Sequence, residues 1–133
     1  MHLDHHVGQR LRQDRVGWLT TVGRDGQPQS SPVWFLFDDG CVYIQSQPRA
    51  AKVRNIQSNN RVSFHIDDDG RGGDVVTIEA KAETLEQVPA GLFDRYAEKY
   101  EAEIRDSLRS TAEELAATYA STIRLTPSRA RSW

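Results

Sequence analysis

Two short turn signals divide the first half of the chain into segments that have the composition of β-strands. Asp25-Gly26 and Asp39-Gly40 each lie between runs of β-branched and aromatic residues. An Asp-Gly pair in that position is a strong local indication of a β-hairpin. The two turns separate three predicted strands, at 16–22, 27–37 and 41–46. The sequence therefore predicts an antiparallel meander at the start of the fold.

The hydrophobic period changes after the third strand. Ala50, Val53 and Ile56 recur at helical spacing, so we expect a short helix over 49–57. Further strands are predicted at 61–67, 75–85 and 121–126, and two late helices are predicted after 89 and from near 111. Strands at hairpin spacing with few helices predict a mainly β (α+β) fold, in which a small antiparallel barrel carries helices at its end.

The length of 133 residues fits one domain, 1–133. No apolar run is long enough to cross a bilayer, and the first residues lack the apolar core of a secretory signal, so we expect a soluble, cytoplasmic protein without a membrane partner. The lone Cys41 excludes an internal disulfide. We interpret His2, Asp4, His5 and His6 as part of a frayed terminus and expect no metal there.

A net charge of -2 provides no general attraction to nucleic acid, so any anion must be bound by a local basic cluster. The segment Arg49-Ala50-Ala51-Lys52-Val53-Arg54-Asn55 is such a cluster. At a helix N-terminus, unpaired N–H groups and the helix dipole add to the charges of Arg49 and Lys52, which favours a phosphate. Helical spacing turns Arg54 away from Lys52. The alternative, which spacing alone leaves open, is an ordinary solvated basic face.

The same region resembles a known family. The strand 41–46, the segment from Gln47-Pro48 through Asn55-Ile56, and Asn60-Arg61-Val62-Ser63 are similar to the pyridoxamine 5'-phosphate oxidase superfamily. The hairpin containing Arg24-Asp25-Gly26-Gln27-Pro28 and the ending from Leu125-Thr126-Pro127 to Trp133 resemble its branch of flavin/deazaflavin-dependent oxidoreductases. The resemblance covers about 16–88 and 121–133, and it implies a six-stranded antiparallel split β-barrel.

The resemblance also implies a bound cofactor. Its phosphate would be held by Arg49 and Lys52, and its ring would lie along Ser31-Pro32-Val33-Trp34 and Gln45-Ser46. Pro32 lacks a backbone N–H, so it indicates either a bulge open to a ligand or an ordinary edge-strand position. The short chain is most similar to members that use the deazaflavin coenzyme F420, and FMN is the second choice. The implied activity is hydride transfer to or from a small organic substrate, and we assign no catalytic residue because the cofactor supplies the chemistry.

The family resemblance further implies a homodimer with the cofactor at the interface. The second predicted strand places the apolar residues Val33, Trp34, Phe35, Leu36 and Phe37 on both of its faces. A partner protomer would cover the extra apolar face, and the alternative is that the late helices cover it.

Two other functions suit a small barrel. One is a redox-silent barrel that binds flavin or haem, and the other is a barrel that binds nucleic acid, which the net acidity disfavours. His65 lies on the polar face of its strand, where we favour a surface or dimer contact over a substrate contact. By resemblance the tail Arg129–Trp133 reaches toward the cofactor region, and terminal disorder is the alternative. We expect the acidic, glycine-rich loop 67–74 to be mobile.

Overall fold

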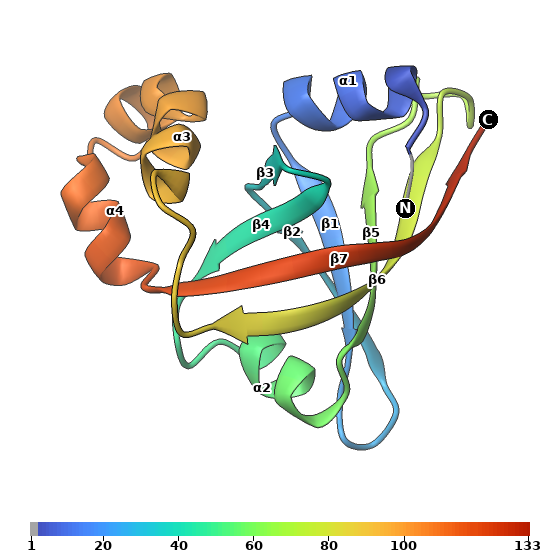
Figure 1. Cartoon of the computed structure of the whole chain (residues 1–133), viewed down its shortest axis with the longest axis horizontal. Helices are drawn as coiled ribbons and strands as arrows, with labels where there is room; N and C mark the ends of the chain where they lie inside the picture. The colour runs from blue at the N-terminus through green and yellow to red at the C-terminus, as the bar shows by residue number, and fades with distance from the viewer. Residues whose placement is uncertain (1–2) are drawn as a thin grey trace.

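A seven-stranded antiparallel sheet curls into a half-open barrel in the computed structural model, which describes residues 3–133 (Figure 1). The elements are α1 (His5–Gln13), β1 (Gly17–Val22), β2 (Pro28–Val33), β3 (Leu36–Asp38), β4 (Cys41–Ser46), α2 (Ala51–Ser58), β5 (Arg61–Ile66), β6 (Val76–Leu85), α3 (Leu92–Lys99), a π-helical turn (Glu103–Ser107), α4 (Ala112–Thr118) and β7 (Ser121–Ser132). The strand order is β2-β1-β5-β6-β7-β4-β3. The antiparallel barrel-like fold with a helix after the β4 strand is as the sequence predicts.

The helices lie around the rim of the sheet rather than over one face. In Figure 1, α1 crosses the upper end, α2 lies at the lower end, and α3 and α4 stand together beyond β3 and β4. Contacts join α1 and α3 to β3, and α2 to β1 and β6. None of the helices within residues 3–133 has the length and apolar character needed to span a membrane.

Both predicted hairpin turns are present. Gly26 has a φ of 84° and its N–H donates to the carbonyl of Gly23 at 2.9 Å. In the turn between β3 and β4, Asp39 and Gly40 both have positive φ, 49° and 76°, which is the type I′ geometry that suits the twist of a hairpin. The Asp-Gly signals therefore predicted the right turns for a local reason, because glycine adopts these backbone angles without strain.

The predicted strand 27–37 is wrong as a single element, since the structure divides it into β2 and β3. The break falls at Trp34 and Phe35. The N–H of Phe35 donates to the Tyr100 hydroxyl at 2.9 Å, and its carbonyl accepts from that hydroxyl at 3.0 Å and from Lys99 Nζ at 2.7 Å. Side chains of α3 and the residue after it thus satisfy the backbone groups that a continuous strand would have paired, and the sheet has seven strands instead of six.

The late helices cover the second apolar face of this strand pair. Tyr96, Tyr100, Ile104 and Leu115 form a small core, and Trp34 and Leu36 pack against it. The main core lies inside the barrel and includes Leu19, Phe64 and Ile78. Gly17 borders that core, where a Cβ would lie 2.2 Å from the Phe64 ring. The alternative in which helices cover the extra apolar face is therefore correct for Trp34 and Leu36.

The two ends of the described chain are more regular than the sequence indicates. Asp4 caps α1 by accepting a hydrogen bond from the N–H of His6 at 2.8 Å, so the interpretation of His5 and His6 as frayed is wrong, while His2 lies outside the described residues. The last strand is predicted to end at 126 but runs to Ser132, because a register shift opposite Glu79 and Ala80 accommodates Pro127. The tail is thus a paired strand and not a disordered terminus.

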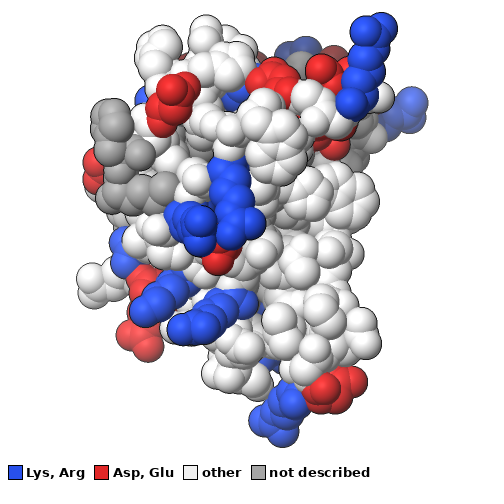
Figure 2. Space-filling model, turned by 90° about the vertical axis from the view of Figure 1, so that its right-hand side faces the viewer, with Lys and Arg blue, Asp and Glu red and all other residues white. Residues whose placement is uncertain are grey.

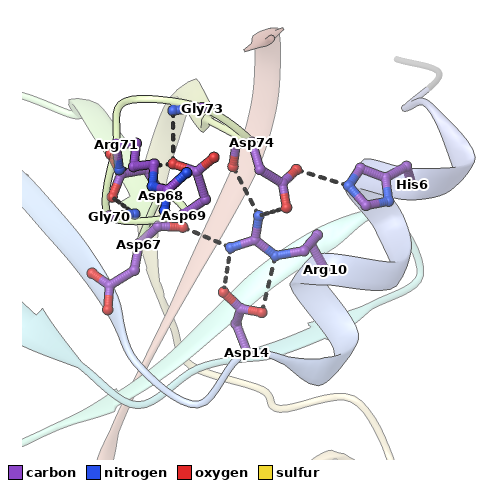
Figure 3. Close-up of polar contacts among 10 residues, drawn as sticks. All are labelled: His6, Arg10, Asp14, Asp67, Asp68, Asp69, Gly70, Arg71, Gly73 and Asp74. Atoms are coloured by element: carbon purple, nitrogen blue, oxygen red, sulfur yellow. Dashed lines mark hydrogen bonds and ion pairs between the residues drawn. The ribbon is translucent and has the colours of Figure 1, made fainter.

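The loop 67–74, expected to be mobile, is tied to α1 (Figure 3). Arg10 donates to the carbonyls of Asp67 and Asp74, at 2.6 Å and 2.8 Å, and also pairs with the carboxylate of Asp14 at 2.8 Å. His6 lies 2.8 Å from the Asp74 carboxylate, and its hydrogen bond, with Arg10 nearby, lowers the pKa of Asp74. Arg10 therefore holds the helix and both ends of the loop together.

Candidate cofactor site

One pocket of about 300 Å³ collects side chains from four parts of the chain. It lies where the end of β2, β4, the first turn of α2 and the late helices meet. Its lining residues are Pro32, Val33, Trp34, Gln45, Lys52, Tyr96, Leu108, Leu115 and Tyr119. The pocket thus joins residues far apart in the sequence, and Lys52 is the charged member of this set.

Lys52 places a cation at the first turn of α2. Its side chain is half-buried, and this burial lowers the pKa of its ammonium group. Within residues 3–133, Lys52 has no carboxylate partner, and no side chain caps the N-terminus of α2 at Ala50. A partly desolvated ammonium beside uncapped helix N–H groups is stabilised by an anion.

Arg49 lies just outside this pocket. The sequence predicted it in the first helical turn, but it belongs to the exposed turn that precedes the Ala50 N-cap. The Arg54 guanidinium folds back and donates to the Arg49 carbonyl, which keeps it away from the pocket, as its helical spacing predicted. Of the three basic residues in the segment, Lys52 alone lines the pocket.

The predicted ring-binding residues are brought together only in part. Pro32, Val33, Trp34 and Gln45 line the pocket. Ser46 is buried and its hydroxyl donates to the Gln47 carbonyl at 3.1 Å. Ser31 is paired with Leu19 within the sheet. Neither serine lines the pocket.

The fourth wall comes from the late helices and was not predicted. Tyr96 and Leu115 are buried, Tyr119 is half-buried, and Leu108 is an apolar residue that remains 47% exposed. The sequence predicted two late helices here, but nothing in the spacing indicated that residues 96, 108, 115 and 119 surround one cavity. Leu108 follows the π-helical turn, which no motif in the sequence predicted.

The other predicted candidates lie away from the pocket. His65 stacks on Trp18 with ring centroids 6.5 Å apart on the outer face of the sheet. The tail pairs with the start of β6, where the N–H of Val75 donates to the Trp133 carbonyl at 2.9 Å, while the pocket lies beside the other end of β7. A group of three or more His, Cys, Asp or Glu side chains placed to hold a metal is absent from residues 3–133.

The chemistry of the lining fits a phosphate-bearing aromatic cofactor. Lys52 and the start of α2 supply positive charge for the phosphate, while Trp34 and the apolar side chains supply flat surfaces for a ring. Gln45 supplies a polar group, although its Nε2 also donates weakly to the Tyr119 carbonyl at 3.4 Å.

The sequence profile of the pyridoxamine 5'-phosphate oxidase family matches residues 3–133. The chain belongs to this family. The family resemblance noted in the sequence is thereby confirmed.

Within the family, this chain is similar in sequence to the 5a,11a-dehydrotetracycline/5a,11a-dehydrooxytetracycline reductase of Streptomyces rimosus subsp. rimosus. The two chains are 36% identical over 90 residues, which cover 64% of this chain and 63% of the relative. The alignment therefore spans less than two thirds of the relative's length.

Solved structures share the fold at lower identity. An F420 reductase matches with a TM-score of 0.75 and 20% identity, over 97% of this chain and 98% of its own. HutZ, the haem storage protein from Vibrio cholerae, matches with a TM-score of 0.75 and 21% identity, over 99% of this chain and 95% of its own. At 20–21% identity these two matches show a shared fold. The functions in the two names belong to those two proteins.

Proposed function

We propose that this protein is an oxidoreductase that transfers a hydride between a bound deazaflavin, F420, and a small organic substrate, with FMN as the alternative cofactor. The observation that carries the proposal is the single pocket in which Lys52, the strand end Pro32–Trp34 and Gln45 meet. The relative that is a reductase and the F420 reductase of the same fold support this choice.

In this proposal the chain binds and orients the cofactor. Lys52 and the N–H groups at the start of α2 hold the phosphate, and Arg49 reaches it from the preceding exposed turn. The ring lies along β2 and β4. When bound, the cofactor supplies the hydride chemistry, so the protein needs no acid, base or nucleophile of its own. The apolar late-helix wall excludes water from the ring.

The experiment is a fluorescence titration of the purified protein with F420 and with FMN. Hydrogen bonds to charged groups contribute about 1.5–3 kcal/mol, so we expect Lys52→Ala to weaken binding by about tenfold or more, and Arg49→Ala to weaken it less. Lys81→Ala is the matched control, because Lys81 is exposed on β6 outside the pocket. Unchanged affinity in both test variants would refute the phosphate site.

A haem-binding barrel is the second candidate, and the fold shared with HutZ supports testing it. The lining of the pocket contains no His, Cys or Met, which are common axial ligands of haem iron. A titration with haemin on the same preparations separates the two functions. Haem binding with no binding of F420 or FMN would replace the oxidoreductase by this alternative.

We also propose that the protein is a homodimer. One half of the face in Figure 2 carries Lys and Arg side chains, and a broad area beside it has no charged residue. The outer positions of β2, β1 and β5, which register places side by side, are uncharged except for Arg61 at the start of β5. The uncharged positions are Pro28, Ser30, Pro32, Trp18, Thr20, Val22, Ser63 and His65. Depletion of charge is typical of the centre of an interface. Because Pro32 lines the pocket too, the pocket borders the proposed interface.

A further inference from the structure

The hydroxyl group of Tyr96 makes no hydrogen bond within residues 3–133, although the residue is only 4% exposed. The other buried tyrosine of the same cluster, Tyr100, uses its hydroxyl in hydrogen bonds to the backbone of Arg15 and Phe35. Among the described residues nothing donates to or accepts from the Tyr96 hydroxyl. Because Tyr96 lines the pocket, its hydroxyl opens into that space and is available to bond to a molecule bound there.

The surroundings of Tyr96 limit what that ligand can be. The late-helix wall consists of Tyr96, Leu108, Leu115 and Tyr119, with no charged side chain among them. With Lys52 on the opposite side of the pocket engaged by the cofactor phosphate, a carboxylate or ammonium group placed at this wall would lose its hydration without gaining an ionic partner. Trp34, whose indole is held parallel to the Tyr100 ring at 4.5 Å, adds a rigid flat surface to the same pocket. The wall therefore favours an uncharged, planar molecule.

We infer that Tyr96 is a specificity-determining residue that donates a hydrogen bond to an acceptor oxygen, such as a ketone oxygen, of an uncharged, planar and mainly apolar substrate. The assignment of this molecule as substrate rests on the proposed function, in which the cofactor occupies the β2, β4 and α2 side of the pocket. The late helices then form the side that is left for the substrate. Burial keeps the hydroxyl protonated, since it raises the pKa of Tyr96 far above its ordinary value.

The test compares three probes of similar size on the F420-loaded and the unloaded protein, by calorimetric titration. The probes are 1-tetralone, which is an uncharged ketone; tetralin, which lacks the oxygen; and 1-tetralone-6-carboxylate, which adds a charge. We compare the wild type with Tyr96→Phe, which removes only the hydroxyl. Tyr43→Phe is the control, because Tyr43 is a buried tyrosine of β4 outside the pocket.

For the wild type we expect 1-tetralone to bind about three- to tenfold more tightly than tetralin, and the carboxylate to bind at least tenfold more weakly than the ketone. Tyr96→Phe should remove the preference for the ketone over tetralin, and Tyr43→Phe should retain it. Equal ketone affinity in wild type and Tyr96→Phe would overturn the inference, as would carboxylate binding at least as tight as that of the ketone.

The cofactor titrations keep this inference separate from the proposed function. If Tyr96→Phe weakens F420 binding and leaves the probes unaffected, the hydroxyl contacts the cofactor and the substrate assignment is wrong. If the wild type binds neither F420 nor FMN, the proposed function fails. The preference of the unloaded protein for 1-tetralone over tetralin, and its loss in Tyr96→Phe, then still decides whether Tyr96 bonds to an acceptor oxygen.

Discussion

The indole of Trp34 and the ring of Tyr100 stack with their centroids 4.5 Å apart and their planes 3° from parallel. Trp34 lines the pocket, while Tyr100 is fully buried behind it and its hydroxyl bonds to the backbone of Phe35, the next residue. The interruption between β2 and β3 and the orientation of a pocket wall therefore have one cause. A residue outside the pocket fixes the shape of the pocket.

Replacing Tyr100 by Phe removes that hydroxyl and leaves the buried N–H of Phe35 without this acceptor. We expect the free energy of unfolding to fall by about 1–3 kcal/mol, which urea denaturation measures. Tyr96→Phe is the matched control, because the Tyr96 hydroxyl has no partner among the described residues and its loss should change stability by less than about 0.5 kcal/mol. Similar losses in the two variants would contradict the hydrogen-bond assignment.

Because of Lys99, we expect the free energy of unfolding to rise at alkaline pH. Burial, with a smaller effect of Arg15, lowers the pKa of Lys99 from 10.5 to about 8. Between these two values the unfolded chain binds the proton more strongly than the folded chain, so stability increases with pH in that window. After solvent screening the gain is of order 1–2 kcal/mol. Lys99→Met should have a flatter curve of unfolding free energy against pH, and identical slopes in both proteins would refute this origin.

Because of Lys52, we expect cofactor binding to weaken as the pH rises, whereas stability increases. Burial lowers the pKa of its ammonium group, so the charge that holds a phosphate is lost at a lower pH than for an ordinary lysine. Affinity for a phosphate-bearing cofactor should therefore fall as the pH rises from about 7 to about 10. Lys52→Arg keeps its charge over this range and should show a smaller decline. Titrations at several pH values measure it, and parallel declines would exclude Lys52 as the group responsible.

Arg10 should control the order of the loop 67–74. Arg10→Met removes the hydrogen bonds to the carbonyls of Asp67 and Asp74. We expect the amides of Gly70, Gly72 and Gly73, which bond to the carboxylates of Asp68 and Asp69, to exchange hydrogen faster as the loop opens. Arg71→Met is the control, since the Arg71 side chain is exposed and makes no contact that orders the loop within residues 3–133. Exchange that is equally fast in both variants would contradict the role of Arg10.

The uncharged outer face should be sensitive to an added charge. Ser30 is exposed near the middle of this face, so Ser30→Glu would bury a carboxylate in the proposed dimer interface. We expect it to shift the protein from dimer to monomer in sedimentation velocity, while Lys81→Glu, three strands away on β6, should have a weaker effect. A wild type that is monomeric at high micromolar concentration would refute the dimer.

The sequence predicted the elements whose cause is local. The Asp-Gly turns, the strands β5 and β6, and the start of α4 near 111 follow from neighbouring residues. At that start, the Thr111 hydroxyl accepts from the N–H of Glu114 at 3.2 Å. The role of Lys52 as a candidate phosphate ligand was predicted for the same reason, because its place in the first turn of a helix depends on neighbouring residues.

The features that were missed depend on contacts between distant residues. The break at Phe35 is made by Tyr100, the order of α1 and its loop depends on Arg10 and Asp74, and β7 continues past Pro127 because β6 accommodates a register shift. Leu108 and Tyr119 join the pocket through the packing of the late helices. Hydrophobic periodicity along the sequence does not indicate which distant residues come into contact.

The position of β7 has a consequence for biosynthesis. It comes last among the strands, yet it lies between β6 and β4 in the sheet. Until its residues leave the ribosome, a β2-β1-β5-β6 sheet and a β3-β4 hairpin have no strand to join them, and both keep an exposed edge. The nascent sheet must therefore stay open to chaperones or aggregation until β7 emerges and joins its two parts.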